Sequence, residues 1–300
     1  MSNCSLIQLA ESYLCLRVDI SAKHAAAVRS AARRLQAATG NGHLPTTTEL
    51  ADWLRQLRAA GRSPATLRHQ VALLGALYRH AWQCGLLQSV PTLPRVRIEQ
   101  HVPEAWTADE VQRLVQGAGL LRGRCKWVPE IPRRLWWQSL LLACWYTAAR
   151  IGALLAVRWH DVDLDSGIVR LRAATTKSRA EQIAMLPASA CRLIDQLPRI
   201  DQRVWPSPRK PHSLWRGFRL VARLAGVPCP AGHRQCFHRL RRSALSAVAA
   251  RDLEAARRLA GHASATVTLR HYVDPRVAGW PQVAVPEIPV SSPERQLTLF

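Results

Sequence analysis

A short segment toward the C-terminal end carries the side chains best suited to chemistry. His238 and Arg241 are three residues apart, so they share one face of the first turn of a predicted helix. His262 follows a glycine suited to end a second helix, and Tyr272 closes a third, shorter one. Together these residues offer two imidazoles, a guanidinium and a phenol. Such groups can transfer protons near neutral pH, stabilise developing negative charge and act as an oxygen nucleophile.

Three predicted helices must position these groups. The first is expected to start at His238 and to expose backbone amides there. Its apolar stripe has helical spacing and consists of Leu240, Ala244, Leu245 and Val248. The second runs over about 253–260, and Ser264 is expected to cap the third. Asp274-Pro275 should end that third helix.

An upstream segment adds another cation and a lysine. Arg150 lies between two alanines and Ile151-Gly152, and an apolar run follows before the acidic stretch 161–164. Residues 168–171 and 182–186 are predicted to form two strands around a polar turn that contains Lys177.

The order of these residues resembles the catalytic signature of the tyrosine recombinase (phage integrase) family. His-x-x-Arg at 238–241, Gly-His at 261–262 and a tyrosine ten residues later resemble its second half. Arg150 looks like its first arginine, and Lys177 occupies the place of its hairpin lysine. The resemblance covers most of the chain, and six positions filled in the right order make a specific pattern.

The resemblance implies a fold and an activity. The fold would be mainly α with a small antiparallel β-sheet, in which a helical, SAM-like core-binding domain precedes a DNA breaking-rejoining catalytic domain. The activity would be site-specific recombination or integration, cutting and rejoining double-stranded DNA through a 3′-phosphotyrosine intermediate. A homotetramer assembled on DNA is implied, with no metal, ATP or other cofactor.

The resemblance also implies a role for each of the six residues. Tyr272 would be the nucleophile, and the two arginines would offset charge on the nonbridging oxygens. His238 would be the general acid/base, and Lys177 would protonate the leaving 5′ oxygen. His262 would donate a hydrogen bond to the scissile phosphate.

Two departures from the family pattern keep other functions open. Ala153 stands where the family often has glutamate, and Arg242 stands where it often has histidine. Loss of that acid favours the alternative of a catalytically weak or inactive DNA-binding protein with the same fold. A type IB topoisomerase-like enzyme would use the same chemistry to relax DNA without strand exchange. These residues leave the target DNA sequence open. They are equally compatible with a phage, mobile-element or chromosomal role, and with cleavage in cis or in trans.

A metal site would be a different class of function at the same place. Cys229, His233, Cys236 and His238 are all metal-capable side chains. Their spacing matches no common zinc finger, and His238 cannot serve both purposes. We therefore expect no metal ligands here.

Composition indicates a partner of the opposite charge. The 42 basic residues against 20 acidic ones give a net charge of +22, which predicts salt-dependent binding to a polyanion. The eight cysteines are scattered, and several lie in apolar helical patterns, as expected of free thiols in a reducing compartment. The first residues lack a signal-peptide pattern, and the most apolar span is interrupted by polar residues. We expect a cytoplasmic, nucleoid-associated protein without a membrane span.

Four domain segments are predicted. Residues 1–97 show four amphipathic helical patterns and carry 12 basic residues against four acidic ones, as a core-binding domain would. Prolines interrupt the following stretch, so 98–105 is the predicted linker and 106–280 the catalytic domain. The tail, 281–300, is expected to dock its apolar end on a neighbouring protomer. Arg68, Arg95, Arg97 and Arg242 are the expected further DNA contacts.

Overall fold

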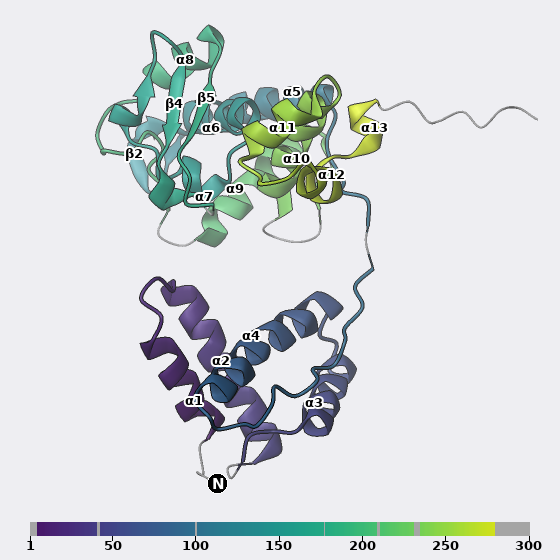
Figure 1. The fold of residues 1–300 in the computed structure, drawn as a ribbon. Coiled ribbons are helices and arrows are strands. Elements are labelled where there is room, and N and C mark those ends of the chain that lie inside the picture. The colour runs from purple at the N-terminus through teal and green to yellow at the C-terminus, as the bar shows by residue number, and fades with distance from the viewer. Residues whose placement is uncertain are drawn as a thin grey trace, which may run out of the picture. The chain divides into compact units, whose positions relative to one another are not determined.

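The computed structural model describes residues 5–40, 43–99, 101–176, 178–208, 211–230 and 235–279. The chain divides into two compact units, residues 1–101 and 102–300 (Figure 1). Lys177, His233 and the tail lie outside the described residues, and so do the predictions made for them. Within the described part, no helix is both long enough and apolar enough to span a bilayer.

The first unit is a bundle of four helices. These are α1 (Leu6–Cys15), α2 (Ala22–Thr39), α3 (Thr47–Ala59) and α4 (Pro64–Gln83). Each begins at a serine or threonine whose hydroxyl accepts a hydrogen bond from a backbone amide of the first turn, which satisfies an otherwise unpaired donor. Apolar residues such as Val28, Leu50 and Leu74 point inward and are fully buried. All four predicted helices are present.

The second unit is built around an aromatic core. Its main helices are α5 (Ala108–Gly119), α6 (Arg133–Thr147), α9 (Pro211–Leu224) and α10 (Gln235–Ala249). Trp137 and Phe237 stack at 6.3 Å between ring centroids, and Phe218 meets Phe237 edge-on at 4.7 Å. This core fixes the first turn of α10, which carries candidate site residues.

Two small antiparallel sheets complete the second unit. One pairs β1 (Arg124–Cys125) with β2 (Val128–Pro132). The other has the order β3-β4-β5, with β3 at Val162–Asp163, β4 at Ile168–Leu171 and β5 at Gln182–Met185. Leu171 pairs with Gln182, so the turn between β4 and β5 is the predicted hairpin. The fold is mainly α with small antiparallel sheets, as predicted; the β1-β2 pair was not foreseen.

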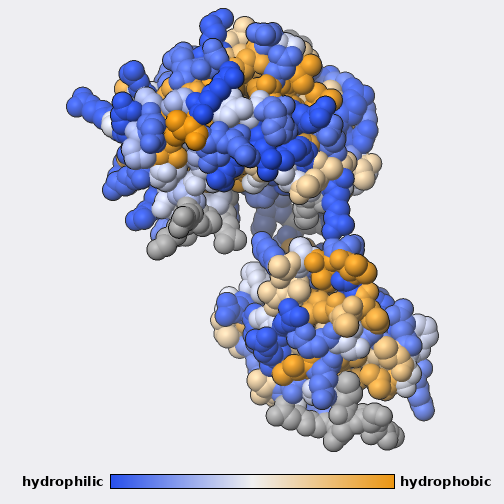
Figure 2. Space-filling view, turned by 90° about the vertical axis from the view of Figure 1, so that its left-hand side faces the viewer, coloured by the Kyte–Doolittle hydropathy of each residue, from blue (hydrophilic) through white to orange (hydrophobic). Residues whose placement is uncertain are grey.

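Short helices surround the sheet and close the chain. They are α7 (Ile151–Leu154), α8 (Ala188–Asp195), α11 (Leu253–Ala260), α12 (Ala265–Tyr272) and α13 (Pro275–Ala278). Helices α10, α11 and α12 lie side by side (Figure 1), and their buried residues form a separate small core that includes Leu245 and Val273. Figure 2 shows the side of the second unit that lies on the left in Figure 1, where hydrophilic side chains cover most of the surface, with hydrophobic patches between them.

The structure corrects two details of the predicted helices and, after α12 ends at Tyr272 as predicted, adds a further helix. Helix α10 begins at Gln235, so His238 lies inside its first turn rather than at its start. Ser264 is the N-cap of α12 but its side chain makes no capping hydrogen bond. Pro275 opens α13, because a proline at the first helical position gives up no hydrogen bond.

Candidate active site

Arg241 is the centre of the candidate site. Its side chain is 2% exposed, and it projects from α10 toward two helix ends. The guanidinium donates to the backbone carbonyl of Ala148, after α6, and to that of Ala260, at the end of α11, at 2.8 Å. No carboxylate among the described residues pairs with Arg241, and its Nε has no hydrogen-bond partner there. A buried cation without a counter-charge is costly, and a bound anion would offset that cost.

Burial has the largest effect on the pKa of Arg241. Burial lowers its pKa to about 10, nearby Tyr272 opposes this, and nearby Arg150 adds to it. The guanidinium therefore stays charged at neutral pH.

His262 lies against Arg241 at the end of the αL turn made by Gly261. Its Nε2 is 3.3 Å from Arg241 Nη2, and its Nδ1 is 3.0 Å from the hydroxyl of buried Thr268. Because a guanidinium only donates, Nε2 accepts and Nδ1 carries the proton toward Thr268. Burial, with Arg241 and Arg150 nearby, lowers the pKa of His262 to about 4, so the ring is neutral at pH 7.

Tyr272 covers this pair from α12. The guanidinium carbon of Arg241 is 5.0 Å from the centre of its ring, and the His262 ring is 4.6 Å away, tilted by 42°. His238, exposed on α10, has its ring centre 6.4 Å from that of Tyr272. The phenol is thus surrounded by one cation and two imidazoles.

Backbone and side-chain bonds fix the end of α12. Ser246 of α10 donates to the carbonyl of Tyr272 at 3.3 Å and accepts from the amide of Asp274 at 2.8 Å. Asp274, 1% exposed, accepts from the amide of Ala105 at 3.1 Å and from Arg276. These bonds hold Tyr272 over the Arg241 side chain of its own chain.

Arg150 is the fifth sequence-predicted residue at this place. It is half-buried and is the N-cap of α7, directly after Ala148 and Ala149. Its charge acts on both Arg241 and His262, and no described carboxylate pairs with it. Five of the six predicted residues therefore belong to one cluster, and the sixth, Lys177, is outside the described residues.

Sequence reasoning missed two residues that shape the cluster. Thr268 orients His262, as described above. Gln182, the first residue of β5, lies against Gly261: a Cβ atom built there would be 1.5 Å from Gln182 Nε2. That amide nitrogen is buried and has no described hydrogen-bond partner. The only sequence signal for Gln182 is its place at the start of the second predicted strand of the hairpin.

The chain matches a known family over most of its second unit. Residues 106–278 match the phage integrase family. The chain belongs to the phage integrase family. Among curated proteins, the tyrosine recombinase XerC of Xanthomonas axonopodis pv. citri is 28% identical over 146 residues, 46% of this chain and 44% of that protein. The prophage integrase IntR of Escherichia coli is 31% identical over 117 residues, 37% of this chain and 24% of its own length. The match thus spans less than half of these relatives.

Solved structures of lambda integrase share the fold. A lambda integrase dimer bound to a COC′ core site has a TM-score of 0.69 and 19% identity, covering 93% of this chain and 79% of that one. A lambda integrase tetramer bound to a Holliday junction has a TM-score of 0.68 and 17% identity, covering 95% and 81%.

The other arginines expected to bind DNA in this member of the phage integrase family are not part of the cluster. Arg68, Arg95 and Arg97 are exposed in the first unit. Arg95 and Arg97 line a hollow of about 930 Å³ there, together with Arg55 and Arg58. Arg242 donates from Nε to the carbonyl of His271 at 3.2 Å, so it braces α12.

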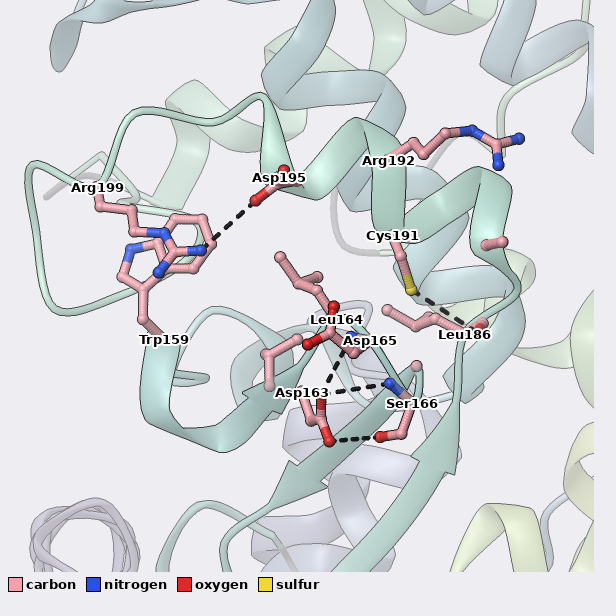
Figure 3. Close-up of a pocket in the computed structure, with 13 residues that line it drawn as sticks. Trp159, Asp163, Leu164, Asp165, Ser166, Leu186, Cys191, Arg192, Asp195 and Arg199 are labelled. Atoms are coloured by element: carbon pink, nitrogen blue, oxygen red, sulfur yellow. Dashed lines mark hydrogen bonds and ion pairs between the residues drawn. The ribbon is translucent and has the colours of Figure 1, made fainter.

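A second hollow, of about 720 Å³, lies beside the β3-β4-β5 sheet and contains none of the six residues (Figure 3). The Arg199 guanidinium lies 4.9 Å over the Trp159 ring, and Asp163 binds the backbone and hydroxyl of Ser166 in the β3-β4 turn. These contacts satisfy the turn and the loop locally.

Proposed function

We propose that the chain is a site-specific DNA recombinase that cleaves and rejoins DNA through a phosphotyrosine at Tyr272. One observation carries the proposal: the Tyr272 ring lies over a buried arginine that has no carboxylate partner in the described structure. A phosphodiester supplies the missing negative charge, and binding it would bring phosphorus to the phenol.

In the proposed reaction, Tyr272 Oη attacks the phosphorus and the bond to the 5′ oxygen breaks. His238, near the ring, accepts the phenol proton, and Lys177 donates a proton to the leaving oxygen. Arg150 and Arg241 stabilise the charge on the nonbridging oxygens. A 5′ hydroxyl of a second strand then attacks the phosphotyrosine and releases the enzyme, so no bond energy is lost.

His262 would change role when DNA binds. In the free protein its Nε2 accepts from Arg241. A phosphate that takes over this arginine hydrogen frees Nε2, and the negative charge of the phosphate raises the pKa of His262. Nε2 could then take up a proton from solvent and donate a hydrogen bond to the phosphate. Thr268 would hold the ring plane during this change.

The partner in this proposal is double-stranded DNA bound by several copies of the chain. The net charge of +22 and family membership support it. The first unit would bind the DNA core site, with Arg68, Arg95 and Arg97 as contacts, and Arg242 would contribute near the cleavage centre. A tetramer would bring two duplexes together.

A suicide substrate tests this function. A nicked duplex that carries the protein's own recombination site should trap a covalent protein–DNA adduct. The adduct should survive denaturant and form without divalent metal. Tyr272→Phe should abolish the adduct yet bind the same duplex almost as tightly, because only one oxygen is lost. Equal adduct yield from both proteins would overturn the assignment of Tyr272.

The same assay addresses the alternative of a weak or inactive DNA-binding protein. That alternative rests on Ala153, which is 4% exposed and leaves no acid beside Arg150 at this position. DNA binding without any adduct from the wild-type protein would favour it.

A further inference from the structure

Two thiols that play no part in the proposed chemistry are in direct contact. The Sγ atoms of Cys229 and Cys236 are 2.8 Å apart, and both cysteines are free. The other described cysteines are Cys15 and Cys84, which are exposed, and Cys125, Cys144 and Cys191, which are buried. None of those five has a sulfur partner within the described residues.

Rigid surroundings hold the two sulfurs together. Cys229 lies between two prolines, and the carbonyl of Pro228 accepts a hydrogen bond from the buried Trp106 indole at 3.1 Å. Cys236 is the second residue of α10 and is 1% exposed. Both backbones are thus restrained by the core rather than by each other, so the contact is preorganised.

The two thiols differ in reactivity. Cys229 is partly exposed, whereas Cys236 is buried. The hydrogen bond from Cys236, with Arg219 and Arg239 nearby, lowers the pKa of the Cys229 thiol. The same hydrogen bond, with burial, raises the pKa of Cys236. Cys229 is therefore the thiol that would attack an external reagent, and Cys236 the one that would follow.

We propose that Cys229 and Cys236 form a redox-active pair that a low-molecular-weight disulfide oxidises reversibly. The Cys229 thiolate attacks one sulfur of the reagent and releases one thiol, leaving a mixed disulfide. Cys236 loses its proton to solvent, since the negative charge beside it is gone, and attacks the Cys229 sulfur. A second thiol leaves, so two protein thiols are oxidised and one disulfide is reduced.

The oxidised pair would restrain the catalytic helix. Its loop closes within the first turn of α10, two residues before His238. This inference goes beyond the proposed function and does not depend on it, because the thiol chemistry is measured without DNA.

Oxidised glutathione and peptide mass spectrometry test the pair in the full-length protein. After acid quenching and alkylation, wild-type protein should contain a Cys229–Cys236 disulfide and no retained glutathione at either residue. Exposed Cys84 serves as the matched control, since it can only keep glutathione. Cys236→Ser should retain glutathione on Cys229 nearly stoichiometrically, whereas Cys229→Ser should leave Cys236 unmodified. Reductant should reverse both products.

Two results would overturn the proposal. One is wild-type protein that keeps glutathione on Cys229 as fully as Cys236→Ser does. The other is a pair that stays reduced, or is held by stoichiometric zinc, under conditions that modify Cys84. If Cys236→Ser does not fold, Cys236→Ala replaces it, and the wild-type disulfide alone still decides the outcome.

Discussion

Arg241 is held by backbone carbonyls, and this choice of partner determines what the site can bind. A carboxylate in the same place would neutralise the guanidinium and compete with phosphate. Carbonyl oxygens position the fork while leaving its charge uncompensated. Arg241 is also structural, because its hydrogen bonds connect the end of α6 to the end of α11. A substitution of Arg241 would therefore change stability as well as catalysis.

Arg150 gives a cleaner test of charge stabilisation. Arg150→Ala should slow cleavage of the suicide substrate by about 10²–10³-fold, as loss of one transition-state donor does. Its affinity for a long duplex should fall far less, because many other cations contribute. Arg192→Ala, which removes an exposed arginine beside the second hollow, is the matched control and should cleave normally. Parallel losses of affinity and cleavage in Arg150→Ala would mean that it only holds DNA.

His262 should make stability depend on pH. Its pKa is lowered from 6.5 to about 4 in the folded protein, so between these values the unfolded chain binds a proton that the folded protein does not. The free energy of unfolding should therefore fall as pH drops through this window, by on the order of 1–3 kcal/mol from this residue. Urea titrations at pH 7 and pH 4.5 should show a smaller drop for His262→Asn than for wild type. An equal drop would contradict the assigned pKa direction.

The sequence predicted which residues form the cluster better than it predicted which residues they contact. The order of residues from Arg150 to Tyr272 was enough to place five of them in one cluster. It gave no sign that Thr268 would orient His262 or that two carbonyls would hold Arg241. Those contacts join residues from different helices, and they depend on how the helices pack.

Among the elements, the turn after α11 joins the sheet to the cluster. Gly261 has φ +62°, and the Gln182 side chain of β5 fills the place of a Cβ atom. Strand β5 is therefore packed against the residue before His262. Only glycine satisfies both the backbone and the contact.

Glycine-to-alanine substitutions separate these two demands. Gly226 has φ +61° with nothing within 4 Å of a built Cβ, so Gly226→Ala should cost only the backbone strain, about 1 kcal/mol. Gly261→Ala should cost more, since it also displaces Gln182, and should slow cleavage. Thermal unfolding measures the loss of stability in each variant, and the suicide substrate measures the rate of cleavage. Equal destabilisation with normal cleavage would show that the Gln182 contact has no effect.

Local signals explain which elements were predicted. Caps and periodic apolar residues marked the helices of the first unit, and the hairpin followed from alternation around a polar turn. Helix α13 was missed because Asp274-Pro275 was interpreted only as a stop, although Asp274 also accepts from the amide of Arg276 and starts a new helix. The start of α10 was predicted too late, because residues 235–237, ahead of His238, are already helical.

For the whole molecule, the position of Tyr272 over its own chain's Arg241 favours cleavage in cis. Mixing Tyr272→Phe with Arg150→Ala protein should then give no more adduct than either alone, since neither chain holds a complete site. Each variant mixed with wild type is the control for assembly. Restored adduct formation in the double-variant mixture would mean that the nucleophile is exchanged between protomers.

Asp274 gives the second unit a mechanical connection. It accepts a hydrogen bond from Ala105, in the segment by which the chain enters this unit, and it lies two residues after Tyr272. A displacement of that entering segment would therefore reach, through the buried Asp274 carboxylate, the backbone that presents the phenol. The entering segment and the nucleophile are therefore coupled over a short distance, so a displacement of the first would shift the second.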